Sequence, residues 1–134
     1  MNRLRTIRIG ICSNGPIICS SPTKPEWKFI ISICNCDKQK HEYLINCKTT
    51  SKNQDNLWPG EFIIDDLFGR GQTKVCPYNL FRVPIPDLSS FKYIGTLDEV
   101  HMPKFQTGLQ IAIKKNLFTP PETLEIMDSW QPFF

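Results

Sequence analysis

Residues 47–52 read Cys-Lys-Thr-Thr-Ser-Lys and directly follow a strand-like run, Glu-Tyr-Leu-Ile-Asn, at 42–46. Ammonium groups attract a phosphodiester without reading its sequence, and threonine hydroxyls donate hydrogen bonds to its oxygens. The cluster of Lys48, Thr49, Thr50 and Lys52 can therefore hold a phosphate where a strand enters a loop. The alternative is a solvated turn, a common use of Ser, Thr and Lys after a strand.

Three further side chains have the chemistry to contact a nucleic acid. Lys28 precedes the apolar run at 29–34, where it is either a phosphate contact or a solvated charge at the edge of a strand. Trp27 can stack on an unpaired base, and it serves equally well as a core residue. Arg70 lies in Phe-Gly-Arg-Gly, which predicts a hairpin tip from which a guanidinium can reach a phosphate.

The histidines and cysteines give no sign of a metal site. The six cysteines never form a CxxC pair, and most lie in apolar runs, which predicts buried thiols. His41 and His101 add no zinc-ligand spacing. Histidine titrates in the pH range useful for acid–base catalysis. The residues around His41 and His101 give no sign of a catalytic role, so we expect both to be exposed loop histidines. We predict no metal and no cofactor.

Length and charge limit the classes of protein. A chain of 134 residues suits one domain with a core of its own. The net charge of +3 is concentrated in residues 1–30, which permits an anionic partner such as RNA. No apolar run is long enough to span a membrane or to form a signal core, so we expect a cytoplasmic protein with reduced thiols.

The elements that must position these residues are mainly strands. Apolar runs bounded by Gly, Pro and Asn predict a small all-β barrel or sandwich through the first hundred residues. The predicted strands are at 6–12, 16–19, 28–34, 42–47, 60–64, 80–84 and 92–97.

Helices are predicted only near the C-terminus. Apolar residues recur at helical spacing over 103–118, behind Pro103. A capping box, Thr119 to Glu122, predicts a second and shorter helix. The aromatic tail at 130–134 either packs back on the domain or meets a partner.

The order of these elements resembles the MazF/PemK family of toxin endoribonucleases over residues 15–118. A loop rich in charges and prolines leads to an apolar strand ending in Ser at 21–32, and a second strand ends in a Thr-rich turn at 43–52. A strand, a variable linker, a strand closing in a small-residue turn, and a last helix follow at 61–64, 74–84, 93–97 and 103–118. The resemblance implies an α+β fold, mainly β with a C-terminal helix: a small SH3-like barrel of the CcdB/PemK type. We expect this barrel at 1–118 and an extension at 119–134.

The resemblance also implies a function. Such toxins form homodimers, cleave single-stranded RNA without metal, and are neutralised by an antitoxin protein. The ribose 2′-hydroxyl attacks the adjacent phosphate, so the protein must move protons and stabilise an anionic phosphorane. Arg and Thr conventionally carry these roles in the family. The alternative is a catalytically inactive barrel that binds RNA or protein, or acts as a regulator.

The family's catalytic pattern maps onto this chain with one departure. Its Arg position holds Glu26, and Lys28, two residues along the strand, is the predicted replacement. The family's Thr maps to Thr49 after a one-residue shift, with Thr50 next. The predicted catalytic residues are thus Lys28, Thr49 and Thr50, and the predicted RNA-binding residues are Lys24, Trp27, Lys48, Lys52 and Arg70.

Overall fold

A mainly β fold with two C-terminal helices is present, as predicted, in the computed structural model, which describes residues 8–12, 15–20, 29–37, 39–52, 55–69, 71–85 and 92–130. Within these ranges the order of elements is β1 (Arg8–Ile9), β2 (Ile11–Cys12), β3 (Gly15–Ser20), β4 (Phe29–Ser32), β5 (Cys36–Asp37), β6 (Tyr43–Thr50), β7 (Phe62–Ile64), β8 (Thr73–Pro84), β9 (Tyr93–Thr96), α1 (Met102–Lys114) and α2 (Pro120–Ser129). Neither helix in this part of the chain combines the length and apolar character needed to cross a membrane.

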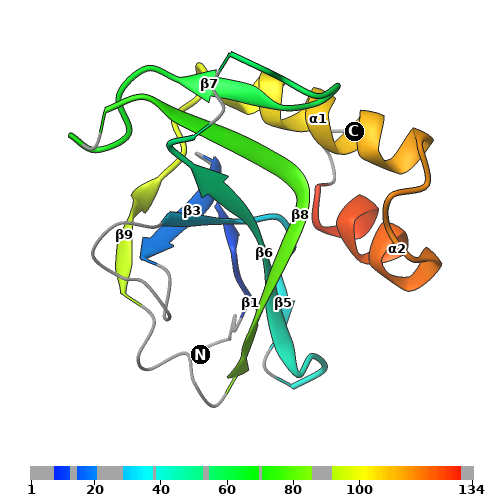
Figure 1. Ribbon diagram of the computed structural model, residues 1–134. Coiled ribbons are helices and arrows are strands. Elements are labelled where there is room, and N and C mark those ends of the chain that lie inside the picture. The colour runs from blue at the N-terminus through cyan, green and yellow to red at the C-terminus, as the bar shows by residue number, and fades with distance from the viewer. Residues whose placement is uncertain are drawn as a thin grey trace.

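The main sheet is antiparallel and curls into a half-barrel (Figure 1). Its strand order is β2-β3-β4-β6-β8-β7, and β9 also pairs with β3. The short strands β1 and β5 form a separate pair. This arrangement confirms the predicted fold class, a small α+β barrel with helices at its C-terminal end.

Strand β8 differs most from the sequence prediction, because it begins at Thr73 and not at residue 80. Proline inside an apolar run argues against a strand, since it cannot donate to the ladder, and Pro77 interrupts this run. In the structure, Cys47 pairs with Leu80 and Lys48 already pairs with Cys76, so β8 carries extra residues between them. Pro77 lies in this irregular stretch, where β8 bends sharply (Figure 1).

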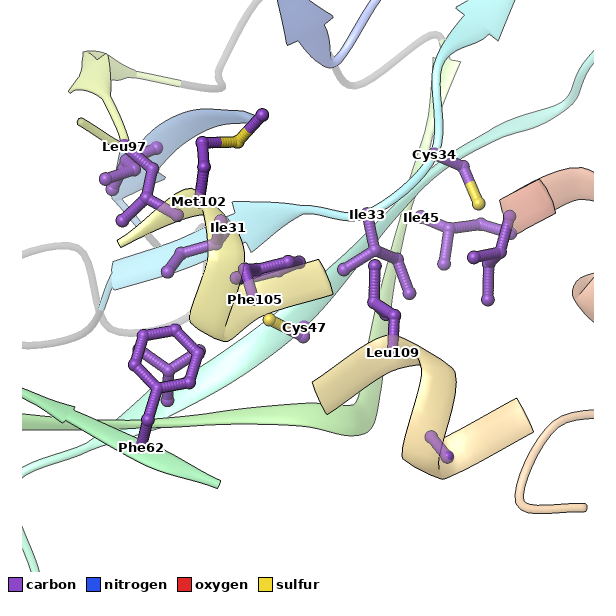
Figure 2. Packing of buried hydrophobic residues seen from close by; sticks show 14 of the residues in the cluster. Ile31, Ile33, Cys34, Ile45, Cys47, Phe62, Leu97, Met102, Phe105 and Leu109 are labelled. Carbon is purple, nitrogen blue, oxygen red and sulfur yellow. The ribbon is translucent and has the colours of Figure 1, made fainter. Parts of the chain in front are cut away.

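The core lies between the concave face of the sheet and α1. Phe105 and Leu109 of α1 are fully buried, and Figure 2 shows them beside Ile31 and Ile33 of the strand β4 region. Helical spacing brings these two side chains to one face of α1, as the sequence predicted. Full burial of such a side chain contributes about 1.5–3 kcal/mol, so this contact is a major source of stability.

Helix α2 is attached to the same core through Trp130. Thr119 and Glu122 form the predicted capping box at its start. The Trp130 ring is fully buried and stacks on Phe105 with 5.4 Å between ring centroids. Its Nε1–H donates to the carbonyl oxygen of Ile33 at 2.8 Å. Trp130 therefore packs back on the domain, while the rest of the aromatic tail lies outside the described residues.

One end of the half-barrel gathers several strand ends, and we call it the mouth. The register places Ser20 opposite Phe29, Thr50 opposite Lys74, and Ile64 opposite Thr73. The end of β6 thus lies beside the start of β4 and the start of β8. The segment that joins β7 to β8 also lies at this end.

Candidate functional site

Four of the predicted site residues fall outside the part of the chain that the structure describes. They are Lys24, Trp27, Lys28 and Arg70. Lys28 directly precedes β4, whose first residue, Phe29, is at the mouth. The other four predicted residues all lie at or just after the end of β6.

Thr49 and Thr50 point to opposite faces of the sheet, as successive residues of a strand must. Thr49 is only 6 % exposed, and its hydroxyl donates to the carbonyl oxygen of Phe29 at 2.8 Å. Thr50 is half-buried, and its Oγ1 accepts a hydrogen bond from the backbone N–H of Lys52 at 3.1 Å. The structure thus brings Thr50 and Lys52 together and uses the Thr49 hydroxyl to hold the start of β4.

Lys48 is exposed on the same face of β6 as Thr50. Its ammonium lies 5.8 Å from the centroid of the Phe81 ring, within the range of a cation–π interaction. The charge remains open to solvent on its other sides, so Lys48 can still attract an anion.

A cavity of about 160 Å³ lies at the mouth, between the β7–β8 segment and the start of α1. It is smaller than the usual site for a drug-sized ligand, so it suits a single sugar, phosphate or base. Its lining combines apolar and polar side chains in similar measure, and the lining residues are Ile18, Ile64, Asp66, Leu67, Phe68, Thr96, Leu97, Asp98 and His101.

His101 and Asp98 form an ordered pair at this cavity. His101 Nδ1 lies 2.6 Å from Asp98 Oδ1, and the backbone N–H of His101 donates to the same oxygen at 3.1 Å. A carboxylate only accepts hydrogen bonds, so the pair places the proton on Nδ1. The ring stacks on Phe62 at 6.5 Å, and the side chain is 18 % exposed. Nε2 has no hydrogen-bond partner within the described ranges.

Phe68 forms the rim of the cavity in a strained conformation. Its φ angle is +50°, a region that residues other than glycine rarely adopt. The ring packs directly over Gly95, where an added Cβ would lie 2.5 Å from Phe68 Cζ. The ring also makes an edge contact with Phe29, at 6.3 Å between centroids. Phe68 therefore contacts both the cavity and Phe29, the first residue of β4, whose carbonyl oxygen accepts the Thr49 hydrogen bond.

A second polar cluster lies on the other side of β7. Tyr78 donates to Glu61 Oε2 at 2.5 Å, and the N–H of Trp58 donates to Oε1 at 2.8 Å. Lys74 Nζ lies 3.5 Å from the same Oε1, with side-chain exposures of 4 % for Glu61 and 7 % for Lys74. Burial alone would raise the pKa of Glu61, but these hydrogen bonds, the Cys76 thiol and the Lys74 charge together lower it. Burial and the Glu61 carboxylate raise the pKa of Tyr78.

The cysteines with described side chains are all buried and unbridged, which confirms the predicted buried thiols for Cys19, Cys34, Cys36, Cys47 and Cys76. Burial raises the pKa of Cys19 to about 12 and that of Cys47 well above its ordinary value. These two thiols are therefore protonated at neutral pH and are poor nucleophiles. Among the described residues, no group of three or more His, Cys, Asp or Glu is arranged to hold a metal ion.

Both histidines make side-chain contacts that their sequence surroundings did not predict. His41 accepts from the N–H of Asp37 at 2.9 Å and contacts Glu125 at 2.9 Å, so neither histidine is the exposed loop residue that was predicted. For His101 there is a local signal, because Asp98 lies three residues before it at the start of a helix. The Glu61–Tyr78 contact joins residues 17 positions apart and has no such signal.

Comparisons with known proteins do not place the chain in a family. No protein-family model matches it, and no curated protein matches it.

Proposed function

We propose that this protein is a metal-independent endoribonuclease of the toxin type, which cleaves single-stranded RNA and is neutralised by an antitoxin protein. The observation that carries the proposal is the His101–Asp98 pair at a cavity that opens at the mouth. The same end of the half-barrel holds Thr50 and Lys52, a hydroxyl and an ammonium suited to a phosphate.

The chemistry divides among these residues as follows. His101 Nε2 removes the proton from the ribose 2′-hydroxyl, and Asp98 stabilises the imidazolium that forms. The 2′-oxygen bonds to phosphorus, the bond from phosphorus to the 5′-oxygen breaks, and that oxygen takes up a proton from water, while the His101 imidazolium returns its proton to water. The products are a 2′,3′-cyclic phosphate and a 5′-hydroxyl. In this proposal Lys28, Thr50 and Lys52 bind phosphates of the RNA backbone that leads to the reacting bond.

Thr49 has a positioning role in this scheme. Its hydroxyl is bonded to the Phe29 carbonyl, which fixes the first residue of β4 and with it the end of the segment that carries Lys28. The antitoxin would cover the mouth, and the toxin would act in the cytoplasm as a homodimer.

The second candidate is a non-catalytic barrel that binds RNA or protein. It is favoured by the two carboxylates at the cavity, Asp66 and Asp98, which repel a phosphate unless a cation lies between them. Glu26 at the family's arginine position favours it too.

Cleavage of a long single-stranded RNA by the purified chain in EDTA separates the two candidates. The toxin predicts fragments with 2′,3′-cyclic phosphate ends. His101→Gln should lower the rate by about 10²–10⁴, the usual contribution of a positioned base, and Asp98→Asn should lower it less. His41→Gln is the matched control and should cleave normally, because His41 lies beside Glu125 of α2. Intact RNA with the unaltered chain would refute the nuclease and leave the binding module.

A further inference from the structure

A second hollow lies between β7 and the outer side of α1. It is a groove of about 300 Å³, the lower limit for a pocket that holds a drug-sized ligand. Two glycines meet at its side: a Cβ added to Gly108 would lie 2.5 Å from the carbonyl oxygen of Gly60. The lining residues are Gly60, Glu61, Phe62, Pro103, Lys104, Thr107, Gly108 and Ile111.

The groove adjoins the cavity beside His101 through a ring contact. Phe62 lines the groove, and its ring stacks on His101, which lines the cavity. Pro103 and Lys104, two and three residues after His101 in the first turn of α1, also line the groove. The two hollows are therefore separated by one stacked pair of rings.

The charges of the groove favour an anionic ligand. Lys104 and Thr107 are exposed, and Lys104 has no ion-pair partner within the part of the chain that is described. Glu61 is the one acidic residue of the lining, and its charge is offset by Lys74 and by the hydrogen bond from Tyr78. The free charge at this surface is thus positive, and Phe62 and Ile111 provide apolar contact beneath it.

We infer that this groove binds a nucleotide of single-stranded RNA that lies one step beyond the two joined by the cleaved bond, an inference that rests on the function proposed above. Lys104 and Thr107 hold the phosphate, while the side chains of Phe62 and Ile111 contact the base. Such a subsite uses binding energy away from the reacting atoms to place the 2′-hydroxyl at His101. An apolar peptide would leave the Lys104 charge without a partner, so the chemistry favours RNA as the occupant.

Substrate length tests the subsite. We would measure kcat/KM on a dinucleotide and on a tetranucleotide for the unaltered chain, for Lys104→Ala, and for Lys114→Ala. Lys114 is exposed in the last turn of the same helix and is the charge-matched control. Lys104→Ala should lower kcat/KM on the tetranucleotide about tenfold, as expected for one lost charged hydrogen bond, and should leave the dinucleotide unchanged. Equal values for the two lysine variants would overturn the inference.

A binding measurement separates failure of the subsite from failure of the nuclease. Fluorescence anisotropy of a labelled 2′-O-methyl RNA, which cannot be cleaved, gives the affinity at several salt concentrations. Loss of one phosphate contact should reduce the slope of log K against log salt by about 0.7 for Lys104→Ala alone. If the slope falls in this way but the chain does not cleave RNA, the subsite is supported and the protein is an RNA-binding module rather than a nuclease. An unchanged salt slope for Lys104→Ala would refute the subsite, whether or not the chain cleaves RNA.

Discussion

Replacing Gly108 by alanine should destabilise the protein, although the same change in a helix interior is ordinarily favourable. Alanine gains about 0.5–1 kcal/mol over glycine in a helix. Here the added Cβ would lie 2.5 Å from Gly60 O and 2.7 Å from Pro77 Cγ, distances at which something must shift. The two nearest atoms belong to a backbone carbonyl and a proline ring, neither of which can move aside like the end of a flexible side chain. Overpacking of this kind costs about 1–3 kcal/mol, so we expect a net loss of about 1–2 kcal/mol.

Urea denaturation followed by circular dichroism would measure this loss. With a typical slope of about 2 kcal/mol per molar urea, the midpoint should fall by roughly 0.5–1 M. Thr107→Ala is the matched control, because it changes the neighbouring exposed residue and should gain a few tenths of a kcal/mol from helix propensity alone. If Gly108→Ala were as stable as Thr107→Ala, the close contact between α1 and the Gly60 turn would not exist.

Three further predictions concern stability. Glu61→Gln should cost about 1–3 kcal/mol at pH 7, because it removes the carboxylate charge from the buried contact with Lys74. Because the fold lowers the pKa of Glu61, its ionised carboxylate stabilises the protein above pH 4.5, and this stabilisation is lost as the pH falls below that value. The free energy of unfolding should therefore fall more steeply with acid for the unaltered chain than for the variant. Burial raises the pKa of Cys19 from 9.0 to about 12, so the free energy of unfolding should fall as the pH rises above 9. Urea titrations at pH 8 and 10.5 should show a smaller fall for Cys19→Ala than for the unaltered chain. The same fall in both proteins would contradict the burial of this thiol. Trp130→Phe keeps a ring to stack but leaves the buried Ile33 carbonyl without its donor, and a loss of about 1–3 kcal/mol in the same assay is expected; no loss would mean that the bond contributes nothing.

Local patterns in the sequence were sufficient to predict much of the fold. Apolar runs bounded by Gly, Pro and Asn located β3, β4, β6 and β9, and the Thr119–Glu122 box located α2. These features depend on residues within a few positions of one another. The start of β8 was missed for a tertiary reason, because the irregular pairing around Pro77 is set by β6 and not by neighbours in the chain.

The candidate site was only partly predictable for the same reason. Alternation along β6 requires Thr49 and Thr50 to face opposite ways, but the sequence does not say which one faces the core. The structure turns Thr49 toward Phe29, a partner 20 residues away in the chain. The cavity beside His101 is formed by β3, β9, the β7–β8 segment and the start of α1, so no single stretch of sequence contains its shape.

The two polar clusters differ in what remains free, and this difference separates a structural role from a chemical one. Glu61 uses both carboxylate oxygens inside the protein, on Tyr78, Lys74 and the Trp58 turn, so it is suited to holding that turn in place. His101 uses Nδ1 for the hydrogen bond with Asp98, and its Nε2 makes no hydrogen bond within the described ranges of the chain. Variants of Glu61 should therefore reduce stability and variants of His101 should reduce cleavage, each with little effect on the other property. A His101→Gln variant that unfolds as readily as Glu61→Gln would make the histidine structural and would remove the base on which the proposed chemistry depends.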